Sequence, residues 1–249
     1  MRPRDSLHNF GNDVIRVTED ETFVFAGCGR DKVIIRGDDN TVDLGFGQDT
    51  VQGFGDNTVV NGGSGGDRLI GRTGDDSFWG NFGNDVIRTG KGSDYALGGF
   101  GNDLTDTGEG LGIHFGGAGA DTFVIGREIV GNGAADAVIA LDFGNGNDSL
   151  RIAPEILDNV ASVEGGPVDL VPVLQAFDEA GLGVEEVGRR LADTFDGRRA
   201  FREVESFLDR FEANNEGQIL VDATTVTTNE GDVIIALGIT PEQLTAALA

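Results

Sequence analysis

Residues 9–17 read NFGNDVIRV, and residues 81–89 read NFGNDVIRT. The two stretches begin at positions 9 and 81, a separation of eight steps of nine, so they indicate a repeat with a period of nine. Stepping by nine from Asp13 brings three columns into one phase: aspartate, glycine two residues earlier, and an apolar residue two residues later. Three columns of different chemistry in one phase are not expected from composition alone, so the repeat organises residues 8–126.

Nine of the thirteen positions in the first column are aspartates, and each has a glycine two residues before it. The aspartates are Asp13, Asp31, Asp49, Asp67, Asp76, Asp85, Asp94, Asp103 and Asp121. The glycines are Gly11, Gly29, Gly47, Gly65, Gly74, Gly83, Gly92, Gly101 and Gly119. The third column is mainly apolar and reads Ile15, Val24, Val33, Val42, Val51, Val60, Leu69, Phe78, Ile87, Ala96, Thr105, His114 and Phe123.

These residue types suit a row of tight turns that binds cations. Glycine permits positive φ and close backbone approach, which leaves carbonyl oxygens free to point at an ion. Aspartate adds a short ligand with the hard oxygens that calcium prefers. One inward apolar side chain per nonapeptide makes a small core, and the acidic turns repel one another until a cation neutralises them. The metal-free repeat is therefore expected to be largely disordered.

Two nonapeptides match the full pattern GGxGxDxUx: GGSGGDRLI at residues 62–70 and GGAGADTFV at residues 116–124. At these residues the chain resembles the RTX family of haemolysin-type calcium-binding repeats. The resemblance implies an all-β fold, a parallel β-roll with two nonapeptides in each coil. It also implies several bound Ca²⁺ ions, held at the aspartates and glycines of the first two columns.

The columns fade after Phe123, and Asp148 then returns in phase with Gly146 before it and Leu150 after it. Residues 127–152 therefore look like a closing coil, with Asp148 as the last predicted metal ligand. Residues 1–7 form an N-terminal tail.

The C-terminal part changes character. Residues 153–215 contain less glycine and carry Phe201, Val204, Leu208 and Phe211 at helical spacing, which predicts a helical region and makes the C-terminal part a small mixed α/β unit. Residues 216–249 then predict a strand pair around a turn and an apolar tail. Similar endings in RTX proteins form the signal read by a type I secretion channel.

Charge and composition exclude several classes of protein. The net charge of −25 argues against nucleic acid as a partner and makes cations the natural ones. No apolar run is long enough for a transmembrane segment, and residues 1–17 hold no apolar core of a signal peptide. Only Cys28 could form a disulfide.

The leading interpretation is a secreted, extracellular calcium-binding protein with a structural, matrix or adhesion role, and not an enzyme. Ser64 lies in a GxSxG pattern, but inside a perfect nonapeptide and not in a strand-turn-helix elbow. One alternative is the detached C-terminal module of a larger secreted hydrolase, epimerase or toxin. Another is an enzyme housed in residues 153–215.

The turns fall into two sets, because each coil takes two nonapeptides. The odd turns carry an unbroken aspartate column, from Asp13 to Asp121 in steps of 18. The even turns carry Thr22, Asn40, Thr58, Asp76, Asp94 and Gly112. We expect a continuous calcium row on the odd turns. In the even turns we expect hydrogen-bonded closure, with metal only around Asp76 and Asp94.

An aromatic flank accompanies the odd turns, at Phe10, Phe46, Phe82 and Phe100. It is interpreted as a ladder in which each ring packs over the neighbouring turn. The alternative is an exposed stripe for a carbohydrate or cell-surface partner.

Overall fold

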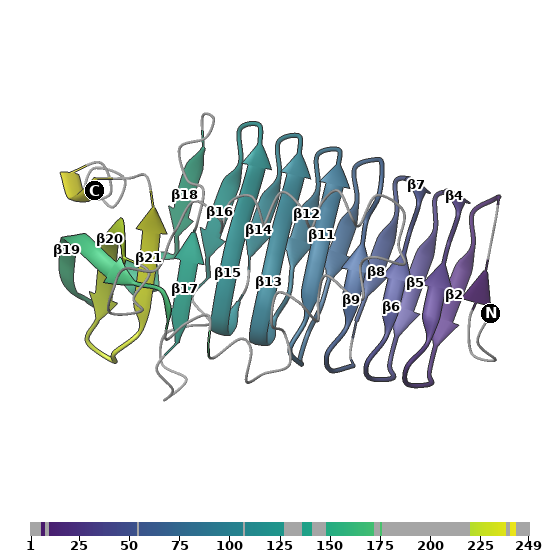
Figure 1. The fold of residues 1–249 in the computed structure, drawn as a ribbon, viewed down its shortest axis with the longest axis horizontal. Helices are drawn as coiled ribbons and strands as arrows, with labels where there is room; N and C mark the ends of the chain where they lie inside the picture. Colours follow the sequence, from purple (N-terminus) through teal and green to yellow (C-terminus); the bar gives the residue numbers. More distant parts are fainter. Residues whose placement is uncertain are drawn as a thin grey trace.

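The computed structural model describes residues 6–7, 10–53, 55–106, 108–126, 136–140, 148–171, 175, 220–237 and 240–242. Parallel strands wind into an elongated, two-sided solenoid, with β2 near one end and β19 to β21 at the other (Figure 1). The predicted parallel β-roll is confirmed.

One side of the roll is an eight-stranded parallel sheet, the small sheet. Its strands are β2 (Val14–Val17), β5 (Lys32–Ile35), β8 (Thr50–Gln52), β10 (Arg68–Ile70), β12 (Val86–Arg88), β14 (Leu104–Asp106), β16 (Thr122–Ile125) and β18 (Ser149–Ile152).

The other side is an eleven-stranded sheet, the large sheet. Its roll strands are β1 (Ser6–Leu7), β3 (Phe23–Phe25), β6 (Thr41–Asp43), β9 (Val59–Asn61), β11 (Ser77–Phe82), β13 (Lys91–Phe100), β15 (Glu109–Ala118) and β17 (Ala137–Ala140). It continues through β21 (Val233–Leu237), β20 (Leu220–Thr228) and β19 (Val160–Asp169). Two short strands, β4 (Cys28–Gly29) and β7 (Phe46–Gly47), pair along the odd turns.

The strand register gives the length of one coil. Leu69 pairs with Val51 on one side and with Ile87 on the other, so adjacent strands of the small sheet are separated by two nonapeptides. Two nonapeptides therefore make one coil, as predicted. Asp31, Asp49 and the other odd-turn aspartates lie where the chain passes from the large sheet to the small sheet, and the even turns lie on the opposite rim.

The predicted inward column forms the core. From Ile15 to Ala96, every member that is apolar is at most 5% exposed. Thr105 and Phe123 are also buried. His114 is fully buried, with its Nδ1 2.8 Å from the hydroxyl of Thr105, so it is a core residue as its column predicts.

The described part of the closing coil agrees with the prediction. β17 pairs with β15, and β18 pairs with β16. Thr122 pairs with Ser149, so this coil spans three nonapeptide lengths instead of two. The extra length explains why the columns fade before Asp148.

The C-terminal strand pair is confirmed, because β20 and β21 form an antiparallel hairpin around residues 229–232. β21 adds to β17 in parallel, and β19 pairs with β20. The hairpin therefore ends the large sheet.

The predicted helical region is wrong at Val160–Asp169, which is the long strand β19. The short helix α1 (Pro154–Leu157) precedes this strand, and Val171 and Gln175 after it are helical. The β19 segment reads VASVEGGPVD, in which β-branched valines favour a strand, while Gly165, Gly166 and Pro167 disfavour a helix. The arginine-rich remainder of the predicted region lies outside the described residues. No helix in the described part of the chain has the length and apolar character needed to cross a membrane.

Candidate metal centre

The glycine column has the backbone conformation that its prediction requires. All nine predicted glycines have positive φ, between 108° at Gly74 and 150° at Gly119. At Gly65, φ is 136°, and a Cβ atom would overlap the carbonyl oxygen of Gly47 in the preceding coil. Glycine is therefore required by backbone conformation and by close approach of adjacent turns.

The odd-turn aspartates stack into a continuous ladder. The Oδ1 atom of Asp67 accepts the backbone N–H of Asp49 at 2.8 Å, and the same bond recurs at every odd turn. The ladder joins Asp13, Asp31, Asp49, Asp67, Asp85, Asp103, Asp121 and Asp148. Asp148 occupies the predicted place, since its Oδ1 accepts the N–H of Asp121 at 2.8 Å.

The second carboxylate oxygen of these aspartates is buried without a hydrogen-bond partner. This holds for Oδ2 of Asp31, Asp49, Asp67, Asp85 and Asp103. A buried carboxylate oxygen with no partner is costly, so a row of them points to a bound cation.

Burial raises the pKa of these carboxyl groups. Desolvation is the largest cause in each case, and it brings the pKa of Asp49 to about 6 and that of Asp85 to about 7. It brings the pKa values of Asp67 and Asp103 to about 8, where neighbouring aspartates add repulsion. The pKa of Asp121 is raised as well. Ionising these aspartates in the odd turns therefore costs free energy, and a bound divalent ion would offset that cost.

Space next to these oxygens is provided by a second set of glycines, five residues before the aspartates. A Cβ atom on Gly62 would lie 2.8 Å from Oδ2 of Asp67 and 2.8 Å from the carbonyl oxygen of Gly80. A Cβ atom on Gly98 would meet Asp103 and the next glycine carbonyl in the same way. The four glycines of this set are Gly62, Gly80, Gly98 and Gly116. Each leaves a small space lined by oxygen, which we call the glycine cradle.

The first coils lack the glycine cradle. Five residues before Asp31 and Asp49 stand Ala26 and Leu44, which are fully buried in the core. These two positions carry a side chain where the later coils carry glycine. The cradle therefore accompanies the aspartates from Asp67 onward, which the column of aspartates alone does not reveal.

Side chains alone would not complete such a site. Within the residues that the structure describes, no three His, Cys, Asp or Glu side chains gather closely enough to hold a metal ion. Calcium takes six to eight oxygen ligands, including backbone carbonyls. The residues therefore fit calcium if carbonyl oxygens of the turns join the aspartate Oδ2 atoms.

The even turns at Thr22 and Asn40 close by side-chain hydrogen bonds, as expected. The expectation fails at Thr58, whose hydroxyl is buried without a hydrogen-bond partner. The amide of Asn40 donates to the carbonyl of Gly37 at 2.6 Å, and its Oδ1 accepts the N–H of Thr22 at 2.8 Å. The hydroxyl of Thr22 lies 3.4 Å from the carbonyl of Glu19. The Asn40 amide thus supplies a hydrogen-bond donor to a turn carbonyl without a cation.

In the later even turns, Asp94 differs from the odd-turn aspartates. Oδ1 of Asp94 accepts the N–H of Asp76 at 2.9 Å, and its Oδ2 accepts the hydroxyl of Thr89 at 2.8 Å. Both oxygens of Asp94 are therefore engaged. Burial raises the pKa of Asp94 well above its usual value. A metal ion around Asp76 and Asp94 stays a prediction.

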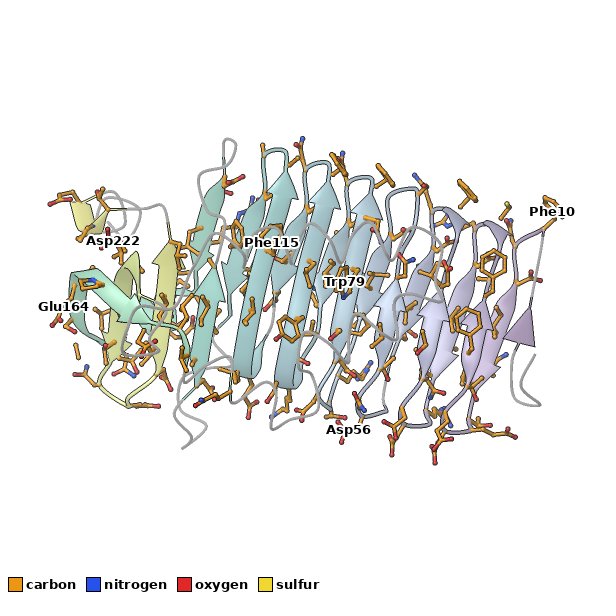
Figure 2. All side chains as sticks on the ribbon, in the orientation of Figure 1. Phe10, Asp56, Trp79, Phe115, Glu164 and Asp222 are labelled. Atoms are coloured by element: carbon orange, nitrogen blue, oxygen red, sulfur yellow. The ribbon has the colours of Figure 1, made fainter. Side chains whose placement is uncertain are left out.

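An exposed carboxylate ladder lies on the same rim, where Figure 2 labels Asp56. Oδ1 of Asp20 accepts the N–H of Asp38 at 2.8 Å, and Asp38 does the same for Asp56. Asp56 accepts the N–H of Asp75 at 2.7 Å. These acids replace the turn glycines at 20, 38 and 56. In the sequence, this ladder is indicated by the occurrence of these acids in the same turns as Thr22, Asn40 and Thr58.

The aromatic flank is a ladder only where two rings are adjacent. Phe82 and Phe100 stack with ring centroids 5.2 Å apart and an interplanar angle of 8°. Phe10 and Phe46 are separated by Cys28 along the same column, and they are 84% and 46% exposed.

Comparison with known proteins agrees with this geometry. The family model of the RTX calcium-binding nonapeptide repeat (4 copies) matches residues 52–87, 61–96 and 79–111. The matches begin at residue 52 and include the cradle glycines Gly62, Gly80 and Gly98. No curated protein matches the chain. The repeat matches, the parallel roll and the aspartate ladder together show that this chain carries RTX calcium-binding nonapeptide repeats wound into a β-roll.

Proposed function

We propose that this protein is secreted and folds when it meets calcium outside the cell, where it serves a structural, matrix or adhesion role without catalysing a reaction. The observation that carries the proposal is the row of buried aspartate Oδ2 atoms without partners in the odd turns. Such a row makes the fold depend on a cation.

The residues that would hold calcium are Asp67, Asp85, Asp103 and Asp121, with carbonyl oxygens of their turns. Bound calcium supplies positive charge and oxygen coordination. The protein supplies a fixed orientation, because each Oδ1 is held by a backbone N–H while Oδ2 faces the glycine cradle. Magnesium demands tighter octahedral geometry and gives up its water reluctantly, so it should substitute poorly.

Calcium dependence suits a protein that leaves the cell unfolded. Extracellular calcium modules bind with dissociation constants on the order of 10⁻⁴ to 10⁻³ M, which is too weak for cytosolic calcium to fold them. We therefore expect residues 216–249 to direct export through a type I channel before the roll forms.

Calcium titration followed by circular dichroism tests the folding step. The chelated protein should lose most of its β-sheet signal, and calcium should restore it while magnesium does not. A chelated sample with the full β-sheet signal and an unchanged thermal transition would contradict the proposal.

Export is tested separately, because deleting β20 and β21 would also remove the end of the large sheet. Residues 216–249 are fused to an unrelated passenger and expressed with a type I channel. Secretion of the fusion supports the signal. Retention of the fusion, with export of the full chain intact, would place the signal elsewhere.

A carbohydrate or cell-surface partner is a second candidate at the aromatic flank, favoured by the exposed rings of Phe10 and Phe46. Glycan binding that Phe46→Ala weakens in the calcium-loaded protein would support it. Equal binding by the variant would contradict it.

A further inference from the structure

The outward face of the small sheet collects positive charge on a very acidic chain, which has 43 acidic and 18 basic residues. The alternation of each strand turns the residues beside the core column outward. On this face one outward residue, Asp106, is acidic and five are basic. The five, which we call the basic face, are Arg16, Lys32, Arg68, Arg88 and Arg151.

The basic face is accessible. Its four arginines are exposed, and Lys32 is half-buried. Arg88 has a partner on this face, since its Nε lies 3.8 Å from Oδ2 of Asp106. In the part of the chain that the structure describes, Lys32 and Arg68 have no acidic partner. Exposed cations that the chain itself does not neutralise favour contact with an anionic surface.

The exposed carboxylate ladder on the even-turn rim offers such a surface. Asp20, Asp38 and Asp56 come from three successive coils and are exposed, and Asp56 lies at the edge of the roll (Figure 2). The Oδ1 atoms of Asp20 and Asp38 are each held at 2.8 Å by a backbone N–H of the next coil. These carboxylates are therefore fixed in a row, and a preorganised row binds with a smaller loss of side-chain entropy.

We propose that the basic face of one copy of this chain binds the exposed carboxylate ladder of a second copy. Both rows repeat with the coil, so their charges are separated along the roll by whole strand spacings of about 4.8 Å. Two rolls with aligned axes can therefore place several carboxylates opposite several cations at once. This shared spacing favours a second copy over an unrelated polyanion, whose charges need not match it.

The contact joins two different surfaces, so it leads beyond a dimer. After one contact, each copy still presents the surface that the contact did not use. Contacts of this heterologous kind build rings or open arrays. The proposal deepens the structural role proposed above and rests on it, because an array of rolls would form a matrix.

The net charge of −25 opposes this association. At ~0.15 M salt, however, exposed charges more than about 8 Å apart are largely screened, so the rows in contact decide the balance. We expect assembly of the calcium-loaded protein at this salt concentration. In ~1 M salt, where the screening length falls to about 3 Å, the assembly should dissociate.

Sedimentation velocity of the full chain with saturating calcium tests the basic face. Arg68→Glu reverses a charge on this face and should weaken the assembly by about tenfold or more. Arg30→Glu makes the same change at an exposed arginine of an odd turn and should leave the assembly unchanged. Equal assembly by the two variants would overturn the proposal.

The ladder is tested in the same way. Asp38→Asn with Asp56→Asn removes two charges but keeps the side-chain oxygens that accept the backbone N–H groups of the next coil. This variant should also assemble about tenfold more weakly or worse. Glu155→Gln with Glu164→Gln, at exposed positions beyond the roll, is the matched control and should assemble normally.

Mixing the two kinds of variant decides whether the surfaces bind each other. Arg68→Glu keeps the ladder, and the double asparagine variant keeps the basic face. An equimolar mixture should therefore form one-to-one dimers at concentrations where neither variant associates alone. A mixture that stays monomeric overturns the proposal.

Far-UV circular dichroism separates this proposal from calcium-dependent folding. A chelated protein that keeps its β-sheet signal contradicts the folding proposal, and its assembly is then measured in that state. A folded wild-type protein that stays monomeric contradicts the assembly alone. Binding of polygalacturonate by that monomer, lost in Arg68→Glu, would assign the basic face to an anionic polymer instead. If Arg68→Glu loses its β-sheet signal, Arg68→Gln replaces it: weaker assembly supports the contact, and unchanged assembly rejects it.

Discussion

The residue five positions before an odd-turn aspartate sets the room beside its carboxylate. Gly62, Gly80, Gly98 and Gly116 leave space beside aspartate Oδ2, whereas the first coils carry Ala26 and Leu44 at this position. The first glycine of the nonapeptide has no positive φ at Gly98, so its role there is steric room and not backbone freedom.

Gly98→Ala should therefore weaken calcium-induced folding without straining the backbone. Its Cβ would lie 2.5 Å from Oδ2 of Asp103 and 2.5 Å from the carbonyl oxygen of Gly116. Repositioning of a metal ligand typically costs ~10- to 100-fold in affinity, and we expect the calcium midpoint of folding to rise by that order. Gly53→Ala is the matched control, because its Cβ would meet neighbours only at ordinary distances of 3.8 Å or more. Equal midpoints for the two variants would refute the role of the cradle.

Asp85→Asn should separate coordination from turn structure. In the wild-type protein, Oδ1 of Asp85 accepts the N–H of Asp67 at 2.7 Å, and Oδ2 has no hydrogen-bond partner. The side-chain oxygen of asparagine can still accept this N–H, while its NH₂ group replaces Oδ2. We expect a calcium midpoint raised by roughly 10- to 100-fold. Asp94→Asn changes an oxygen that already accepts the hydroxyl of Thr89, so its effect should be smaller. Calorimetric titration of both variants checks the order, and a larger loss in Asp94→Asn would reverse this assignment.

The roll contains two kinds of coil. Each of the first four nonapeptides, which contain β2, β3, β5 and β6, places two apolar side chains in the core, such as Ile15 with Val17 and Val42 with Leu44. From β8 onward, each nonapeptide contributes one side chain to the core cluster, from Val51 to Ala96. Each extra buried side chain contributes about 1.5 to 3 kcal/mol, so the first coils depend less on metal. Their even turns are also closed by Thr22 and Asn40.

Hydrogen exchange in chelator should reveal this division. Amides of β2, β3, β5 and β6 should keep measurable protection, while those of β10, β12, β14 and β16 should exchange as in an unfolded chain. Nearest-neighbour stabilisation in a solenoid permits such partial folding. Mass spectrometry of the chelated protein, with the calcium-loaded protein as reference, makes the comparison. Uniform loss of protection along the roll would show that all coils depend on calcium alike.

The sequence predicted the roll because a period of nine leaves little choice of strand or turn. The column from Ile15 to Phe123 identified the core, and the column from Asp13 to Asp148 identified the odd-turn ladder. The cradle was harder to recognise, because its glycines lie five residues before the aspartate and belong to the opposite strand. β19 was mistaken for a helix because Val160–Asp169 was included in a region whose helical pattern comes from residues after 200.

The sheets terminate differently at the two ends of the roll. At one end β20 and β19 terminate the large sheet with antiparallel pairing, and a separate core cluster around Ile125, Ile156 and Val226 supports them. At the other end β2 is an edge strand of the small sheet, and Val14 on it is 57% exposed. Only the first end is closed by its own elements among the described residues.

The raised pKa values of the odd-turn aspartates determine how the stability of the metal-free protein should depend on pH. Asp49, Asp67, Asp85 and Asp103 have their pKa values raised from 3.8 to between about 6 and about 8 by burial. The folded metal-free protein therefore binds protons more tightly than the unfolded chain, so protonation favours folding. Its stability should be greatest below pH about 4 and should fall as the pH rises through about 6 to 8.

Calcium should reverse this trend, because its ligands must be deprotonated and metal competes with protons for the same oxygens. The stabilisation by calcium should thus be small near pH 5 and largest near pH 8. Thermal unfolding followed by circular dichroism across that range, with chelator and with calcium, measures both curves. Asp67→Asn removes one of the raised carboxyl groups and should flatten the chelated curve, whereas exposed Asp38→Asn should not. A chelated protein whose unfolding temperature rises from pH 5 to pH 8 would show that these aspartates do not control the fold.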